Sequence, residues 1–147
     1  AGARRDRIGH ALHFALIRGQ ADPGVPTLVR VHMLNPLADA LHWRRPDFGP
    51  AVGDVLGMIA REGRGALVLL GEHQDTEAVL ARVREQPESP RDRSGSLAEW
   101  RRNGAGAQIL ADLGLGKLRV IGMPRRQVGL AGYGLEVVEY LEPEARA

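Results

Sequence analysis

The sequence predicts a mixed α/β (α+β) domain in which one mixed sheet is flanked by helices. Three observations predict this class. Apolar runs alternate along the chain with segments of helical periodicity, a short apolar run at 65–71 is bounded by glycines, and 147 residues suit one domain. Because we find no internal repeat, we treat residues 1–147 as a single domain.

Two strands are expected near the start of the chain. Residues 10–19 (HALHFALIRG) and 27–34 (TLVRVHML) are rich in β-forming residues, and the ADPGVP between them contains the Pro and Gly of a turn. A short connection of this kind favours pairing between its two flanking strands. We therefore expect these two strands to be antiparallel neighbours.

A helix and a central strand should follow. The helix is predicted over 51–63, where Gly63 is a suitable stop. Residues 65–71 (GALVLLG) are continuously apolar, as in a strand covered on both faces. One apolar face of the helix is marked by residues spaced i, i+3, i+4 and i+7, namely Val52, Val55, Leu56 and Ile59.

The second half of the chain predicts further helices and two strands. A short helix is expected over 75–85 and a mobile loop over 86–96, which contains two prolines and alternating charges. Ser96 and Glu99 form a capping box that opens a helix to about Leu113, with Gly114 beyond its end.

The last predicted elements are strands at 117–122 and 134–142, which alternate in hydropathy. Pro124 should begin a short helix between them.

Composition excludes several classes of protein. The chain has 44% apolar residues and no apolar run long enough for a membrane span. With no cysteine it has neither disulfides nor thiolate metal ligands, and we expect a cytoplasmic protein. A net charge of +2 and 4% aromatic residues argue against nucleic-acid binding. The start AGARRDR lacks an initiator Met, so we expect a piece of a longer chain.

Five motifs in order along the chain resemble the GTP cyclohydrolase II family of riboflavin biosynthesis. Each motif is weak alone, but their order is specific, and they span nearly the whole chain. They are Arg30-Val31-His32, Arg61-Glu62-Gly63-Arg64-Gly65, Gly106-Ala107-Gln108-Ile109-Leu110 through Leu113-Gly114, Lys117-Leu118-Arg119, and Gly132-Tyr133-Gly134-Leu135-Glu136-Val137-Val138-Glu139.

The resemblance implies a larger context for this domain. In that family such a domain often follows a 3,4-dihydroxy-2-butanone 4-phosphate synthase domain in the same polypeptide. We therefore expect an upstream synthase domain with its own Mg²⁺, and a homodimer.

The metal site of the family is expected to be lost. The resemblance places its three cysteine ligands at Asn35, Pro46 and Phe48. Pro and Phe have no donor atom for zinc, so we expect no zinc and no other cofactor in this domain, and no opening of the guanine ring. A replacement site is the alternative, but its candidates match no known ligand spacing: His32, Asp39, His42 and Asp47.

The residues at the family's phosphate-contact positions also depart from the family pattern. Its Gly- and Arg-rich phosphate segment corresponds to about Glu72-His73-Gln74-Asp75, where two acids would repel a triphosphate. The family's nucleophilic Arg corresponds to Arg101, with Glu99 at the position of its partner acid. These two residues are either vestigial parts of the helix start or a retained phosphate contact.

Three more residues are candidate nucleotide contacts by the same resemblance. Arg30 and His32 belong to the R-V-H motif. Arg126 is the one carry-over for a Lys of the family in the segment that begins at Ile121.

Several other residues have a simpler structural explanation. His10 and His13 would point to opposite faces of a strand, which argues against a shared metal. Arg61 and Arg64 are expected to close a surface turn, with an anion contact as the alternative. Gly104 and Gly106 cost about 1 kcal/mol each inside a helix, so we expect close packing there against another element or a second subunit.

The resulting hypothesis is a degenerate GTP cyclohydrolase II-like domain without cyclohydrolase activity. Its role would be to stabilise, dimerise or regulate the attached synthase. Two alternatives stay open: residual pyrophosphate release from GTP through Arg101, and a module that senses GTP or a flavin without turnover.

Overall fold

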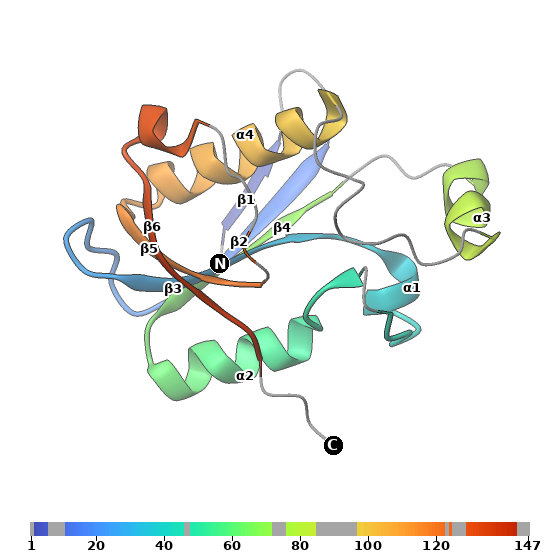
Figure 1. Cartoon of the computed structure of the whole chain (residues 1–147), viewed down its shortest axis with the longest axis horizontal. Coiled ribbons are helices and arrows are strands. Elements are labelled where there is room, and N and C mark those ends of the chain that lie inside the picture. The colour runs from blue at the N-terminus through green and yellow to red at the C-terminus, as the bar shows by residue number, and fades with distance from the viewer. Residues whose placement is uncertain are drawn as a thin grey trace.

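The computed structural model describes residues 2–5, 11–45, 48–71, 76–84, 97–122, 124 and 129–143. These residues form one six-stranded sheet of order β1-β2-β4-β3-β5-β6, with helices on both faces (Figure 1). The predicted mixed α/β class is confirmed. The strands are β1 (Gly2–Arg5), β2 (Leu12–Arg18), β3 (Thr27–Met33), β4 (Gly65–Leu70), β5 (Lys117–Ile121) and β6 (Glu136–Leu141).

The helices are α1 (Pro36–Asp39), α2 (Val52–Glu62), α3 (Thr76–Arg84), α4 (Leu97–Asp112) and a 3-10 helix, η2 (Leu130–Tyr133). Figure 1 shows α4 above the sheet and α2 below it, with α1 and α3 beyond the ends of β3 and β4. Among the described residues, no helix combines the length and apolar character that crossing a bilayer requires.

The pairing of the first two predicted strands corrects the sequence-based expectation. Both strands form, but β2 and β3 are not neighbours, because β4 lies between them. β4 pairs antiparallel with β2, where Phe14 lies opposite Leu69, and parallel with β3, where Val31 lies opposite Val68. The run of apolar residues in β4 explains this, since a strand covered on both faces belongs at the centre.

The core on the α4 face joins the sheet to α4 through small residues. Gly106 lies directly over β3, where a Cβ at this position would lie 2.9 Å from Cγ1 of Val31. This close approach confirms the predicted reason for a glycine inside the helix, whereas Gly104 meets only the hydroxyl of Tyr133 at 3.6 Å. The buried core residues here are Ala15, Val29, Ala66, Val68, Leu70, Ala107, Ile109, Leu110, Leu115, Leu118 and Leu135.

The core on the α2 face is smaller. Val55 and Ile59 of α2 pack on Leu28, Leu67 and Ile121. The helix ends as predicted at Gly63, which has a left-handed φ of 78° and donates its N–H to the Ile59 carbonyl. Leu56, predicted to share the buried face, is instead 40% exposed, so only part of the predicted stripe is core.

Three local features differ from the sequence-based expectation or went unpredicted. β1 and α1 were not expected. Between β5 and β6 the described helical turn is η2, which begins after Gly129 with its left-handed φ of 92°; residues 125–128, where the helix predicted from Pro124 would run, lie outside the described residues. The loop predicted over 86–96, which includes Ser96, lies outside the described residues.

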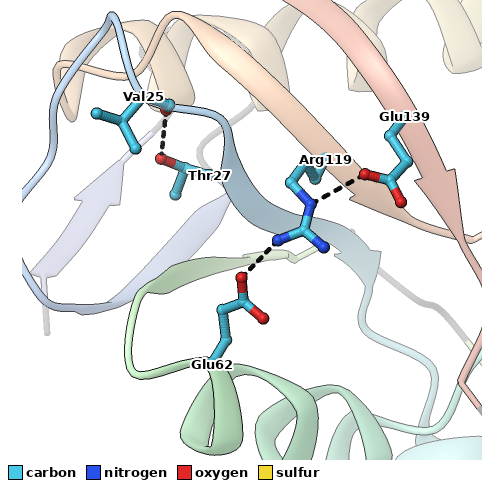
Figure 2. A network of polar contacts seen from close by, with 5 residues as sticks. All are labelled: Val25, Thr27, Glu62, Arg119 and Glu139. Atoms are coloured by element: carbon cyan, nitrogen blue, oxygen red, sulfur yellow. Dashed lines mark hydrogen bonds and ion pairs between the residues drawn. The ribbon is translucent and has the colours of Figure 1, made fainter.

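A polar network ties the end of α2 to β5 and β6 (Figure 2). Arg119 donates from Nε to Glu139 at 3.1 Å and from Nη1 to Glu62, and these carboxylates raise the pKa of Arg119. In the same view, the buried Thr27 hydroxyl donates to the Val25 carbonyl at 3.0 Å and closes the turn before β3. The helix-to-strand turn predicted around Glu62 is confirmed.

Candidate functional site

The ends of the parallel strands define the candidate site. β3, β4 and β5 run parallel, so their carboxyl ends meet at one edge of the sheet, which we call the carboxyl edge. Ligands of open α/β sheets bind in this position, because loops from several strands converge there. The described residues of the carboxyl edge are 34–45, 48–50, Gly71, Gly122 and Pro124.

Asp39 is the centre of a polar cluster at this edge. Its Oδ1 lies 2.8 Å from Nε2 of His32, and its Oδ2 accepts the backbone N–H of Asn35 at 2.7 Å. The Asn35 side chain in turn accepts the N–H of Leu37 at 3.1 Å and so caps α1. His32 and Asn35 are both buried. The carboxylate of Asp39 therefore joins the end of β3 to the start of α1.

Burial favours the neutral form of His32. It lowers the pKa of His32 below the ordinary value, which outweighs the opposing effect of Asp39, while Arg30 lowers the pKa further. We assign the proton to Nε2, which lies 2.8 Å from the Asp39 carboxyl oxygen that accepts it. Nδ1 of His32 has no hydrogen-bond partner within the described part of the chain.

Arg30 lies on the same face of β3 as His32, two residues earlier. Its Nη1 donates to the carbonyl of Ile121 at 3.1 Å. A Cβ on Gly122 would lie 2.6 Å from this Nη1, and a Cβ on Gly49 would lie 2.8 Å from Nη2. The guanidinium therefore sits between two glycine backbones and links β3 to β5 and to the loop before α2.

The positions at which the resemblance would place the family's zinc ligands have other contacts where they are described. Asn35 uses its carboxamide oxygen as the cap of α1. Phe48 packs edge-on against Trp43 with ring centroids 6.2 Å apart, and the Arg45 guanidinium lies 4.7 Å from the Phe48 centroid. Pro46 lies outside the described residues.

A replacement metal site finds no support among the described residues, where no three His, Asp or Glu side chains lie close enough to share an ion. His42 is exposed and has a positive φ of 54°. Asp47 lies outside the described residues. The expected absence of zinc stays a prediction that rests on residue identity.

The structure covers the predicted site residues unevenly. It brings Arg30 and His32 together on one face of β3 at the carboxyl edge. Glu99 and Arg101 belong to α4, but their side chains are not among those described, and Arg126 and residues 72–75 lie outside the described ranges. The roles suggested for these residues stay predictions.

Two contacts at the carboxyl edge were missed by sequence reasoning. Asn35 followed by Pro36 is the pattern of an N-cap with proline in the first turn, and it could have revealed α1 and hence the position of Asp39. His13 is buried, and its Nδ1 accepts the N–H of Gly71 at 3.2 Å. Because that contact joins residues far apart in the sequence, no local sequence pattern predicts it.

Comparison with known proteins shows what this chain resembles. The family model for GTP cyclohydrolase II matches residues 3–142. A 3,4-dihydroxy-2-butanone 4-phosphate synthase of Pseudomonas syringae pv. tomato is 41% identical over 138 residues, which is 91% of this chain and 37% of that protein. The riboflavin biosynthesis protein RibBA of Bacillus cereus (strain ATCC 14579) is 39% identical over 136 residues, 86% of this chain and 34% of that protein.

A solved structure shares the fold. It is described as RibBX, a two-domain 3,4-dihydroxy-2-butanone 4-phosphate synthase from A. baumannii, and it matches with a TM-score of 0.52 at 24% identity. The match covers 89% of this chain and 32% of that one. The chain thus spans about a third of the length of these relatives, between 32% and 37%.

Proposed function

Because the chain belongs to the GTP cyclohydrolase II family, we propose that it is a zinc-free domain serving riboflavin biosynthesis as the non-catalytic part of a longer synthase chain. The synthase would be a 3,4-dihydroxy-2-butanone 4-phosphate synthase, and its Mg²⁺ would be bound outside these residues. The domain would stabilise, dimerise or regulate that synthase.

One observation supports this proposal above the others: the residue at the first zinc-ligand position is used for capping. The Asn35 carboxamide oxygen accepts from the Leu37 N–H, and Asn35 is only 8% exposed. A cation at this oxygen would compete with the Leu37 N–H, and losing the cap of α1 costs about 0.5–2 kcal/mol. Zinc in proteins prefers thiolate, imidazole and carboxylate donors, and a carboxamide is not among them.

The other residues of the predicted metal site do not fit zinc either. The chain has no cysteine, and Phe48 offers only a ring. His32 is a potential nitrogen ligand, but its Nε2 is bound to Asp39, so the two side chains satisfy each other. No step of cyclohydrolase chemistry can be assigned to this set of residues.

The lengths of the relatives support the context of the proposal. Two proteins named as synthases or as RibBA leave roughly two thirds of their length outside the match, since this chain covers 37% and 34% of them. The matched third therefore lies within longer chains in both relatives. A domain that keeps its fold but not its ligands is expected to act through the protein that carries it.

The proposal is tested by comparing a synthase chain with and without residues 1–147. The expected result is a change in at least one of three properties: turnover, assembly state and thermal stability. If all three were identical, the proposed role would be wrong.

The lost chemistry needs its own measurement. We expect the purified domain to bind no stoichiometric zinc and to release neither formate nor pyrophosphate from GTP. Pyrophosphate release that disappears in Arg101→Ala would instead establish the residual hydrolase. Heat of binding with GTP, FMN or riboflavin would instead indicate a sensor.

A further inference from the structure

Over Leu12–Leu16, strand β2 alternates between exposed and buried side chains, and the exposed ones are apolar. His13 and Ala15 are 8% and 7% exposed and point towards α4. The alternate residues Leu12, Phe14 and Leu16 are 48%, 39% and 36% exposed. We call these three residues the β2 row. In a strand with one solvated face, that face is normally polar, so three large apolar side chains in a row call for an explanation.

The β2 row lies on the same face of the sheet as α2, beyond the strands on which α2 packs. Phe14 lies opposite Leu69, and Leu16 lies opposite Leu67, which is buried under α2. α2, which lies below the sheet in Figure 1, packs on the central strands through Val55 and Ile59, and the described residues of this cluster include none from β2. The apolar surface that α2 covers on the central strands therefore continues along β2, where it is exposed to solvent.

The chain itself indicates what covers this surface. β1, the first described segment, pairs with β2, with Gly2 opposite Ala15 and Arg5 opposite Leu12. A domain joined before residue 1 would enter through the strand next to the β2 row. The relatives have room for such a domain, because the match covers only 37% of the Pseudomonas syringae synthase and 32% of the two-domain RibBX.

We propose that the β2 row is the surface on which the preceding synthase domain of the same chain docks. The inference rests on the proposed function and adds the contact through which the domain acts. Covering the exposed part of these three apolar side chains would remove apolar surface from water and so favour the interface. Apolar patches of this kind on folded domains mark interaction sites.

The absence of cysteine from the chain permits a direct test. Single variants Phe14→Cys and Val138→Cys place one thiol on β2 and one on β6. Val138 is the matched control, because it is 44% exposed and lies on the strand at the opposite end of the sheet. Each variant is made in the 147-residue chain and in a two-domain chain in which the synthase part of the Pseudomonas syringae relative precedes residue 1.

The measured quantity is the rate of thiol modification above that of the matching chain without the introduced cysteine. We expect the rate at position 14 to fall about tenfold or more in the two-domain chain, since access then requires the domains to open. The rate at position 138 should change less than about twofold by the same reasoning. Equal rates at position 14 in both chains would overturn the proposal.

A second copy of the chain is the competing occupant. If position 14 were already protected in the 147-residue chain, and protection rose with protein concentration, the surface would be a homodimer interface and the proposal would be wrong. A charge variant gives an independent readout. Phe14→Glu should abolish any thermal stabilisation of the synthase in the two-domain chain, whereas Val138→Glu should leave it intact.

The two proposals can fail separately. If removal of residues 1–147 alters the synthase but position 14 stays accessible, the proposed function stands and the docking surface lies elsewhere. If removal alters nothing, the proposed function fails whatever the rates at position 14.

Discussion

Around β4 the described contacts are between apolar side chains, whereas at the carboxyl edge they are mostly polar. Leu67 and Val68 are 1% and 0% exposed and are held on opposite faces by α2 and α4. At the carboxyl edge, by contrast, Asp39 binds His32 and the backbone of Asn35. The difference teaches that the sheet interior is held by many apolar contacts, whereas the carboxyl edge depends on a few individual polar contacts.

The largest difference between the two regions should appear on truncating the interior. We expect Leu67→Ala to lower the free energy of unfolding by about 2–5 kcal/mol, because it opens a cavity between β4 and α2. Urea denaturation followed by circular dichroism measures this. Leu41→Ala is the control, since Leu41 is 70% exposed, and its effect should stay within about 0.5 kcal/mol.

Truncating a polar side chain at the carboxyl edge should cause a smaller but still measurable loss of unfolding free energy. Asp39→Ala removes the acceptor of both the His32 Nε2–H and the Asn35 N–H. We expect a loss of about 1–3 kcal/mol, as for buried donors left unpaired. Asp54→Ala is the matched control, because its partner Arg44 is 3.6 Å away and 69% exposed. Equal losses of unfolding free energy in the two variants would show that the Asp39 contacts stabilise the fold no more than the Arg44–Asp54 pair does.

The carboxyl edge should respond to mild acid through His32. The pKa of His32 is lowered by burial, so its folded value lies below its unfolded value of about 6.5. As the pH falls through this window the unfolded state takes up a proton that the folded state does not, and stability falls until the folded pKa is passed.

Comparing wild type with His32→Gln isolates this effect, because glutamine keeps a donor but does not titrate in this range. Urea midpoints at several pH values between about 7.5 and 5 should fall further in wild type than in the variant, since only wild type carries the linked proton. Parallel pH profiles would contradict the assignment.

The smallest effect is expected at the network between α2, β5 and β6. Arg119 and its partners are partly exposed, with side-chain exposures of 25% for Arg119, 44% for Glu62 and 46% for Glu139. Arg119→Ala should therefore lower the free energy of unfolding by only about 0.2–1 kcal/mol. The loss should shrink in about 1 M salt, where screening acts over about 3 Å. A loss that is independent of salt would indicate packing of the Arg119 stem instead.

The sequence predicted most elements of the interior because they carry local signals. The spacing of Val55 and Ile59 and the stop at Gly63 located α2, and the apolar run of β4 located the central strand. β1 was missed because Gly2–Arg5 has no apolar pattern, and it forms a strand through its pairing with β2. The pairing of β2 with β3 was wrong because proximity in sequence was taken as a guide, and the burial of β4 overrode it.

The carboxyl edge was harder to predict because its contacts join distant segments. Arg30 reaches the carbonyl of Ile121, 91 positions further along the chain. The resemblance to the family identified Arg30 and His32 as candidates, but not that Asp39 would bind His32. Residue identity alone predicted the loss of zinc ligands, since a phenylalanine ring has no donor in any fold.

The position of the Arg30 guanidinium couples substitutions at residues 30, 49 and 122. A methyl group at position 49 or 122 would overlap its nitrogen atoms, and both glycines also have positive φ, 71° and 138°. In a saturation library, substitutions at these glycines should therefore show epistasis with position 30: a shorter residue there relieves the overlap but leaves the backbone strain. Reading each position separately would miss the overlap that couples both glycines to Arg30, beyond the backbone strain that each carries by itself.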